Sequence, residues 1–214
     1  MLINVAVTID TICPWCFIGK RRLEKAIRHF TRSHPNVQFD VTWHPFQLDS
    51  TMTKLGRSKL EHYRRKFGPE KSLEIQKIME EVGRQEKIQF SYNGDIGNTF
   101  DSHRLIYWAR SLGKQNEIVE ELFKLYFEEE KNLGVLDTLV MAARRAGIDT
   151  QKATDYLNSD ENVDIIQDLL LDTQKDNFQG VPNIKIADKY TLVGAEEPFT
   201  ILALFEKVVA SSVV

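Results

Sequence analysis

Apolar and polar positions at the start of the chain follow the periodicities of a strand, a helix and a second strand. Residues Leu2 to Ile9 are largely apolar and β-branched, which predicts a strand buried on both faces. From Arg21 to Phe30 the apolar residues recur at helical spacing, and His34-Pro35 ends this segment. Val37 to Phe46 alternates apolar and polar side chains, as a second strand does. This order predicts a parallel crossover between the two strands.

After Leu48 the pattern becomes helical for roughly a hundred residues. Glycines and the pairs Gly68-Pro69 and Asn93-Gly94 separate the periodic segments. The predicted helices are Ser58 to Phe67, Glu70 to Glu86, Phe100 to Leu112, Glu117 to Glu128, Asp137 to Ala146, Thr150 to Leu157 and Val163 to Asn177. The chain then returns to strands at Asn183 to Ile186 and Tyr190 to Val193, and a helix from Pro198 to about Ala210 closes it.

These elements predict an α/β protein in which the two ends of the chain form one domain around a helical insertion. We place the domain built from the ends at residues 1–49 and 178–214, and the helical insertion domain at residues 50–177. A chain of 214 residues with 42% hydrophobic content can bury a substantial core without disulfide or metal staples.

Charge and cysteine usage narrow the class of protein. The net charge of -3, from 28 basic and 31 acidic residues, gives no pull toward nucleic acid or an anionic membrane. No signal-peptide pattern opens the chain, and no apolar run approaches the roughly 18 residues that span a bilayer, so we expect a cytoplasmic protein. The 2 cysteines, Cys13 and Cys16, lie three positions apart, which favours a reactive pair over a disulfide scaffold.

The position of this pair, between a predicted strand and a predicted helix, suits thiol chemistry. A thiolate at a helix N-terminus is stabilised by unpaired backbone N–H groups and by the positive end of the helix dipole. We expect Cys13 to be the exposed attacking thiol and Cys16, one turn later, to be more buried and to resolve the mixed disulfide. Pro14-Trp15 tunes the reduction potential, and the direction of electron flow stays open.

The stretches Cys13-Pro14-Trp15-Cys16 and Gly180-Val181-Pro182, separated by the helical insertion, resemble the DsbA-like branch of the thioredoxin superfamily. Further similarity to the FrnE-like subgroup lies in Trp43 to Leu48, Asn98 to Leu105 and Val193 to Ala195. The resemblance covers essentially the whole chain and implies a thioredoxin-like domain with a large all-helical insertion. The subgroup is related to 2-hydroxychromene-2-carboxylate isomerases and kappa-class glutathione transferases, which typically carry serine in place of Cys13.

The resemblance implies a protein-disulfide oxidoreductase that exchanges its Cys13-Cys16 dithiol with protein or small-thiol substrates. In the family Val181-Pro182 is a cis bond against the cysteine pair, and the residue before the proline pairs with an extended substrate. The candidate substrate-binding residues are therefore Pro14, Trp15, Val181 and Pro182. We expect no organic cofactor, although the sequence is compatible with glutathione as a redox partner. The sequence is also compatible with a homodimer.

Some positions leave substrate preference open. Asn183 stands where relatives usually carry an aromatic residue, and Glu196 stands where glutamine is common. The Asn98 to Leu105 segment implies a wall over the active-site groove, where Phe100 or His103 would touch substrate. Packing in the helical core explains those two side chains equally well.

A zinc site is the rival from a different class, because Cys13, Cys16, His29 and His34 match the spacing of a zinc finger. One predicted helix would hold Cys16 and His29 on the order of 18 Å apart, against metal–ligand bonds of about 2.0 to 2.3 Å. We therefore expect no metal. The basic residues of this helix are expected to form a solvated face: Lys20, Arg21, Arg22, Lys25, Arg28 and Arg32.

Two other functions remain open. A glutathione-dependent transferase or isomerase of the same fold would leave Cys16 dispensable. A chaperone module would hold clients in the helical groove without thiol chemistry. Replacing Cys16 by serine separates these alternatives, because only the dithiol reaction stalls at a mixed disulfide.

Overall fold

The computed structural model describes residues 1–175 and 178–211. Its first elements are strand β1 (Leu2–Ile9), helix α1 (Pro14–Ser33) and strand β2 (Gln38–Pro45). β1 and β2 pair in parallel, which confirms the predicted crossover. Helix α1 begins at Pro14, which confirms the prediction that the cysteine motif opens the helix. Proline suits the first helical position, where its missing N–H has no intrahelical partner. The cysteine motif is therefore the start of the helix itself.

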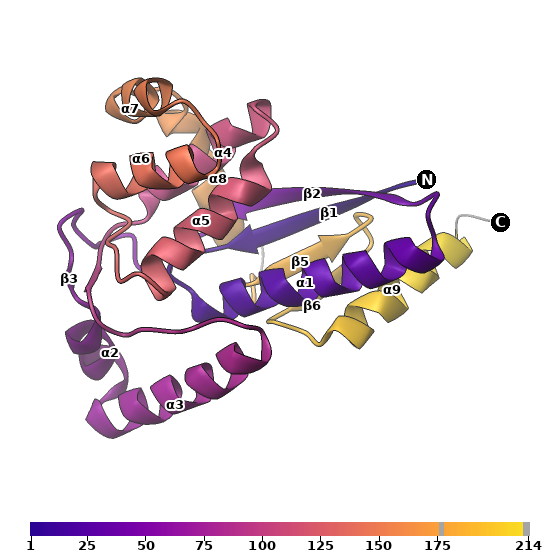
Figure 1. Ribbon diagram of the computed structural model, residues 1–214, viewed down its shortest axis with the longest axis horizontal. Coiled ribbons are helices and arrows are strands. Elements are labelled where there is room, and N and C mark those ends of the chain that lie inside the picture. Colours follow the sequence, from indigo (N-terminus) through magenta and orange to yellow (C-terminus); the bar gives the residue numbers. More distant parts are fainter. Residues whose placement is uncertain (176–177, 212–214) are drawn as a thin grey trace.

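The two ends of the chain meet in one sheet, with strand order β2-β1-β5-β6 (Figure 1). Strands β5 (Asn183–Ile186) and β6 (Tyr190–Val193) have the predicted bounds and form an antiparallel hairpin. β5 also pairs antiparallel with β1, so a late segment of the chain lies beside the first strand. The predicted domain limit between residues 177 and 178 lies beside residues 176–177, which the structure does not describe.

The prediction that β1 is buried on both faces is wrong. Ile3, Val5, Val7 and Ile9 are buried, but Leu2 is exposed and the side chains between them alternate with the buried ones. Helices α1 and α9 (Pro198–Ser211) pack together and cover the buried face. An apolar, β-branched run shows that a strand is buried, but not whether helices cover its second face as well.

The insertion contains all the predicted helices. They are α2 (Lys59–Phe67), α3 (Pro69–Gln85), α4 (Phe100–Ser111), α5 (Gln115–Phe127), α6 (Leu136–Arg145), α7 (Thr150–Asn158) and α8 (Val163–Lys175). The predicted end of the last helix, at Asn177, lies outside the described residues. The insertion also holds a short ladder that was not predicted, β3 (Arg57–Ser58) with β4 (Asp95–Ile96), because such short strands show no periodicity.

Figure 1 shows the α2–α3 pair set apart from the other insertion helices, below the level of the sheet. The rings of Phe17 in α1 and Phe123 in α5 stack with their centroids 5.0 Å apart, so the insertion shares a core with the first helix. The C-terminal helix α9 contributes Phe205, which packs on Phe30 and Phe39. The cysteine end of α1 therefore lies between sheet and insertion.

The expectation that the basic residues of α1 form a solvated face holds only for part of the helix, where Arg28 and Arg32 are exposed. Lys20 and Arg22 are buried. Lys20 and Arg21 both bind Glu120 of α5, and Arg22 donates from Nε to Glu86 at 3.1 Å. Burial alone would raise the pKa of Glu120, but the hydrogen bond from Arg21 and the charge of Lys20 lower it to about 2. These cations therefore join α1 to the insertion.

Candidate active site

Strand β1 delivers the cysteine motif through a tight turn. Cys13 is the N-cap of α1, and its N–H donates to the carbonyl of Asp10 at 3.0 Å. The N–H of Cys16 in turn donates to the carbonyl of Cys13 at 3.0 Å. Both thiols are free, so the structure describes the dithiol form of the pair. The positive end of the α1 dipole lies at Cys13, as a stabilised thiolate requires.

The two thiols differ in depth, but Cys13 is not the exposed side chain that we expected. Cys13 is 5% exposed and Cys16 is 0% exposed. The order of burial is therefore as predicted, whereas Cys13 reaches its surroundings only through a pocket. The expectation failed because the walls of that pocket come from distant parts of the insertion.

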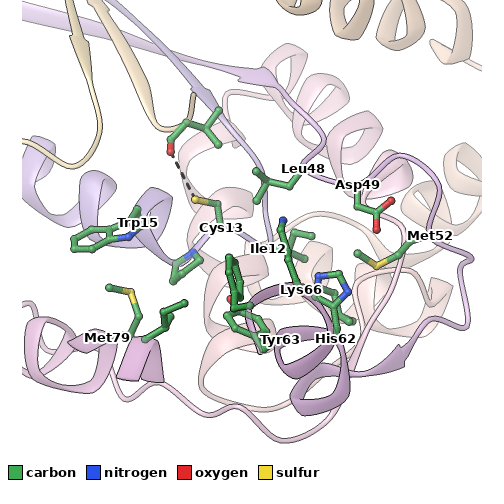
Figure 2. A pocket seen from close by; sticks show the side chains of 15 residues that line it. Ile12, Cys13, Trp15, Leu48, Asp49, Met52, His62, Tyr63, Lys66 and Met79 are labelled. Carbon is green, nitrogen blue, oxygen red and sulfur yellow. Dashed lines mark hydrogen bonds between the residues drawn. The ribbon is translucent and has the colours of Figure 1, made fainter. Parts of the chain in front are cut away.

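The Gly180-Val181-Pro182 segment lies against the cysteine pair. The Val181-Pro182 bond is cis, as the family resemblance implied. The Cys13 thiol points at the carbonyl of Val181, with Sγ 3.8 Å from the oxygen (Figure 2). A Cβ added at Gly19 would lie 3.0 Å from Cγ of Pro182, so a glycine in α1 permits this close approach. Pro182 is thus held between α1 and the sheet.

Burial makes the two thiols chemically unequal. Burial, followed by the hydrogen bond with Cys13, raises the pKa of Cys16 well above its ordinary value. The backbone N–H of Asp10 acts in the opposite direction, since its hydrogen bond favours the Cys16 thiolate. Cys16 therefore remains a thiol at neutral pH unless a nearby group accepts its proton.

A pocket of about 360 Å³ opens beside Cys13 (Figure 2). Its lining is largely apolar, with a few polar side chains. The residues that line it are Ile12, Cys13, Pro14, Trp15, Leu48, Asp49, Met52, His62, Tyr63, Lys66, Phe67, Ile75, Met79, Ile96 and Val181. Burial and then the charge of Cys13 raise the pKa of Tyr63, which places this phenol within electrostatic reach of the thiol.

The pocket brings together some of the predicted site residues and leaves others out. Pro14, Trp15 and Val181 line it with Cys13, whereas Pro182 is not among the lining residues and packs against Gly19 of α1. Phe100 and His103 are not among its lining residues, so the expected contact with substrate is not supported at this pocket. Asn183 pairs with Thr8 and Val193 in the sheet.

Sequence reasoning missed the walls of the pocket that α2 and α3 supply. His62, Tyr63, Lys66 and Phe67 come from α2, and Met79 comes from α3. The helical period of these segments was visible, but periodicity shows that a face is buried without showing what it packs against. No short motif marks these positions.

Lys59 holds the wall helix α2 in place. Its side chain is 1% exposed, and Nζ donates to the carbonyls of Tyr126 at 2.8 Å and Ser91 at 3.2 Å. Nζ also lies 4.0 Å from the centroid of the Tyr126 ring, a cation–π distance. Burial lowers the pKa of Lys59 to about 8. The first residue of α2 is thus tied to the end of α5.

Neither a membrane span nor a metal cluster is found in the described part of the chain. Within residues 1–175 and 178–211, no helix is both long enough and apolar enough to cross a bilayer. In the same residues, no three or more histidine, cysteine, aspartate or glutamate side chains gather as metal ligands would. Cys16 and His29 lie on the one continuous helix α1, which does not fit a zinc finger.

Comparison with known proteins places the chain in a family. Residues 4–206 match the model of the DSBA-like thioredoxin domain, so the chain belongs to the DSBA-like thioredoxin family. Among curated proteins, the uncharacterized protein YwbO of Bacillus subtilis is 25% identical over 190 residues, which cover 88% of each chain. The expected DsbA-like membership is therefore confirmed.

Two solved structures show the same fold. A probable DsbA oxidoreductase from Streptomyces coelicolor superposes with a TM-score of 0.86 at 24% identity, covering 96% of this chain and 89% of the other. A 2-hydroxychromene-2-carboxylate isomerase superposes with a TM-score of 0.69 at 12% identity, covering 100% and 98% of the two chains. The predicted thioredoxin-like fold with a helical insertion is confirmed.

The depressed pKa of Lys59 predicts a pH-dependent contribution to stability. Between pH 8 and 10.5 the unfolded chain keeps a proton on Lys59 that the folded protein has lost, so this contribution rises with pH. A shift from 10.5 to about 8 corresponds to about 3 kcal/mol. The free energy of unfolding of the wild type, minus that of Lys59→Met, should increase over this interval in urea titrations.

Taking the difference between the two proteins removes the opposing groups. The raised pKa values of Cys16 and the buried tyrosines lower stability at alkaline pH in both proteins alike. A difference that is flat from pH 8 to 10.5 would show that Lys59 titrates normally in the folded protein.

Proposed function

We propose that this protein is a thiol–disulfide oxidoreductase that exchanges its Cys13-Cys16 couple with protein or small-molecule thiols and disulfides. The supporting observation is the pair of unequal thiols at the start of α1. Cys13 opens on an apolar pocket, and the fully buried Cys16 follows one helical turn later. Only a dithiol reaction gives Cys16 a role.

The reductive direction runs in two steps. The Cys13 thiolate attacks one sulfur of a substrate disulfide, which forms a mixed disulfide and releases the first substrate thiolate to take a proton. Cys16 then loses its proton and attacks Sγ of Cys13, which closes the Cys13-Cys16 disulfide and releases the second substrate thiolate. Oxidation of a substrate dithiol is the same sequence in reverse.

The surroundings of Cys13 favour an extended, partly apolar substrate. The carbonyl of Val181 lies beside the thiol, where it can accept a hydrogen bond from a substrate backbone. Trp15, Leu48 and Phe67 are exposed large hydrophobic residues that also line the pocket. Exposed apolar side chains gathered around a reactive group mark a binding surface. A cysteine of an unfolded polypeptide, with an apolar neighbour, suits this site.

The proposal predicts one reversible two-electron transition in glutathione redox buffers. Trp15, beside the couple, should change its fluorescence at the midpoint, and alkylation with mass analysis should count two thiols protected together. The transition should disappear in Cys13→Ser, and Cys16→Ser should accumulate a mixed disulfide with glutathione because the resolving thiol is missing.

The same variants separate the alternatives. Normal turnover of disulfide exchange by Cys16→Ser would contradict the proposal and favour a glutathione-dependent transferase or isomerase. The absence of any redox transition in the wild type, with client binding retained, would favour the chaperone module.

The apolar wall of the pocket predicts a separate effect on substrate choice. Phe67→Asp should slow the reduction of disulfides in an unfolded protein about tenfold, since burying one apolar side chain contributes about 1.5 to 3 kcal/mol. Reduction of cystamine, which has no apolar side chain, should keep its rate. Leu73→Asp is the matched control, because Leu73 is an exposed residue of α3 outside the pocket. Equal slowing of both substrates would contradict a binding role for Phe67.

A further inference from the structure

An irregular loop, residues 46–56, joins β2 to β3 and forms one wall of the candidate substrate pocket. Leu48, Asp49 and Met52 of this loop line the pocket, and Figure 2 shows them on the side away from Trp15. A segment without regular secondary structure has no ladder for its backbone N–H and C=O groups, so other residues must bind them. The position of this wall therefore depends on the contacts that the 46–56 loop makes.

Asn98 binds the 46–56 loop with both its side chain and its backbone. Nδ2 of Asn98 donates to the carbonyls of Ser50 at 3.1 Å and Met52 at 2.8 Å. Oδ1 accepts a hydrogen bond from Nε2 of Gln47 at 3.2 Å. The backbone N–H of Asn98 donates to the carbonyl of Thr53 at 3.0 Å. One half-buried residue thus binds the loop both before and after the pocket-lining Met52.

The start of the loop is tied to the turn that carries the reactive thiol. The N–H of Leu48 donates to Oδ2 of Asp10 at 2.7 Å. The carbonyl of Asp10 in turn accepts a hydrogen bond from the N–H of Cys13 at 3.0 Å. Asp10 therefore sets the position of Leu48 relative to Cys13, whereas Asn98 sets the position of Met52.

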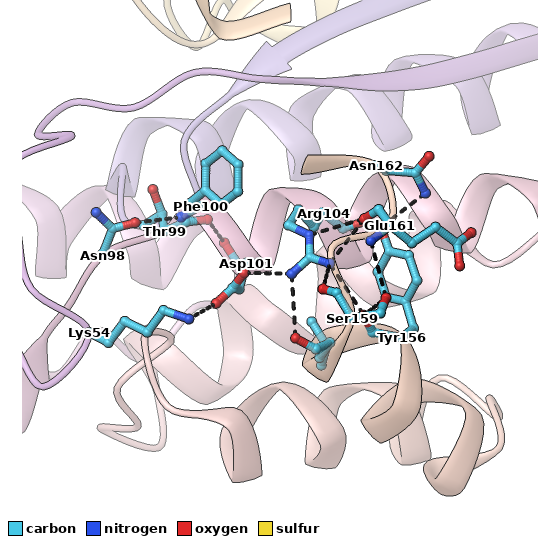
Figure 3. A network of polar contacts seen from close by, with 12 residues as sticks. Lys54, Asn98, Thr99, Phe100, Asp101, Arg104, Tyr156, Ser159, Glu161 and Asn162 are labelled. Atoms are coloured by element: carbon cyan, nitrogen blue, oxygen red, sulfur yellow. Dashed lines mark hydrogen bonds and ion pairs between the residues drawn. The ribbon is translucent and has the colours of Figure 1, made fainter. Parts of the chain in front are cut away.

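Asn98 stands on a rigid part of the insertion, directly before α4. Its Oδ1 accepts a hydrogen bond from the N–H of Phe100 at 2.9 Å. Figure 3 shows Asp101 between Lys54 and Arg104, with N–O distances of 2.5 Å and 3.0 Å. The guanidinium of Arg104 also donates to backbone carbonyls at the end of α7 and just beyond it, those of Tyr156, Leu157, Ser159 and Glu161. The first turn of α4 is thus a fixed support for the loop.

We propose that Asn98 is a positioning residue that holds the 46–56 loop in its binding conformation before a substrate arrives. The inference rests on the proposed disulfide exchange and concerns substrates whose cysteine has an apolar neighbour. Leu48 is 42% exposed and presents its side chain to such a neighbour, whereas Met52 is 4% exposed and supports the wall from within. A wall that is already ordered spares the substrate the entropic cost of ordering it.

Asn132 supplies a matched control on the same loop. Its Nδ2 donates to the carbonyls of Lys54 at 3.0 Å and Leu55 at 2.9 Å. Its Oδ1 accepts a hydrogen bond from the N–H of Gly134 at 2.8 Å. Neither Lys54 nor Leu55 lines the pocket. Asn132→Ala therefore removes a comparable set of hydrogen bonds from a part of the loop that a substrate does not meet.

Single turnovers of the reduced protein measure the effect on substrate binding. Tryptophan fluorescence follows formation of the Cys13-Cys16 disulfide at increasing concentrations of a peptide disulfide that carries leucine beside each cysteine. We expect Asn98→Ala to raise the half-saturating concentration about tenfold, since ordering a side chain on binding costs up to about tenfold in affinity. The limiting rate should stay unchanged, because the reacting sulfurs are the same. The rate with cystamine, which has no apolar side chain, should also be kept.

Asn98→Asp gives the same test in a side chain of the same shape. The carboxylate keeps an acceptor at Oδ1 but has no N–H to donate to Ser50 and Met52. Its half-saturating concentration for the peptide disulfide should therefore rise as in Asn98→Ala. Asn132→Ala should lower the free energy of unfolding in urea by an amount similar to that of Asn98→Ala, but it should bind the peptide disulfide as the wild type does.

A double variant and a redox titration separate positioning from general structure. In a Leu48→Ala background, Asn98→Ala should weaken binding less than it does alone, because the side chain that it positions is absent. The midpoint of the Cys13-Cys16 couple in glutathione buffers should be the same in the wild type and in both Asn98 variants, since neither variant alters the thiols.

Several results would overturn the inference. They are equal weakening by Asn98→Ala and Asn132→Ala, a binding constant for the peptide disulfide that does not change in the Asn98 variants, and equal slowing with cystamine. If the wild type forms no Cys13-Cys16 disulfide with either substrate, it is the proposed function that fails.

The wild-type protein offers a test that does not depend on folding of the variants. In the free, reduced protein the backbone amides of Leu48 and Asn98 should be protected from hydrogen exchange, since both donate to partners that fix the loop. Addition of the same peptide with serine in place of cysteine should not increase this protection. Amides that exchange freely until the peptide is added would show that the substrate orders the loop, and the inference would be wrong.

Discussion

The structure depends on one constraint, the placing of a thiol at the N-cap of a helix that follows a central strand through a tight turn. Strand β1 lies between β2 and β5, so the residues after β1 emerge in the middle of the sheet. Because Thr8 pairs with Asn183, the residues that precede β5 come to lie beside the cysteine motif. The contact between Cys13 and Val181 is therefore a consequence of register, and it requires both ends of the chain to fold together.

The insertion is part of the candidate site, because its helices supply walls of the pocket beside Cys13. Lys20 and Arg21 bind Glu120, and Arg22 binds Glu86, so the helix that carries the thiols is joined to the insertion by buried charges. Buried ion pairs contribute little net stability, because desolvation offsets their attraction, but breaking one partner is costly. Such contacts are better suited to specify one arrangement than to strengthen it, and here the arrangement sets the distance from Cys13 to the walls of its pocket.

Local patterns made much of the fold and part of the site predictable. The helices, the terminal hairpin and the cysteine pair are visible because periodicity, turn residues and the Cys-x-x-Cys spacing are properties of neighbouring residues. Burial of Lys20 was not predictable, since its partner Glu120 is a hundred residues away in the chain. The proximity of Asp10 and His103 was not predicted for the same reason. A lone aspartate at a strand end carries no signal until the strand and α4 are seen together.

The two cysteines are the same residue type, and the fold makes them different reagents. Cys13 lies at the N-terminus of α1 and lines the pocket, so its surroundings suit contact with a substrate. Cys16 receives full burial and a raised pKa, so it reacts only when its proton can leave. Burial thus protects the resolving thiol from direct attack by other disulfides, but it also makes the proton of Cys16 harder to remove. Because Asp10 directly follows β1 and His103 lies in α4 of the insertion, the close approach of these two buried side chains requires both parts of the molecule to be assembled.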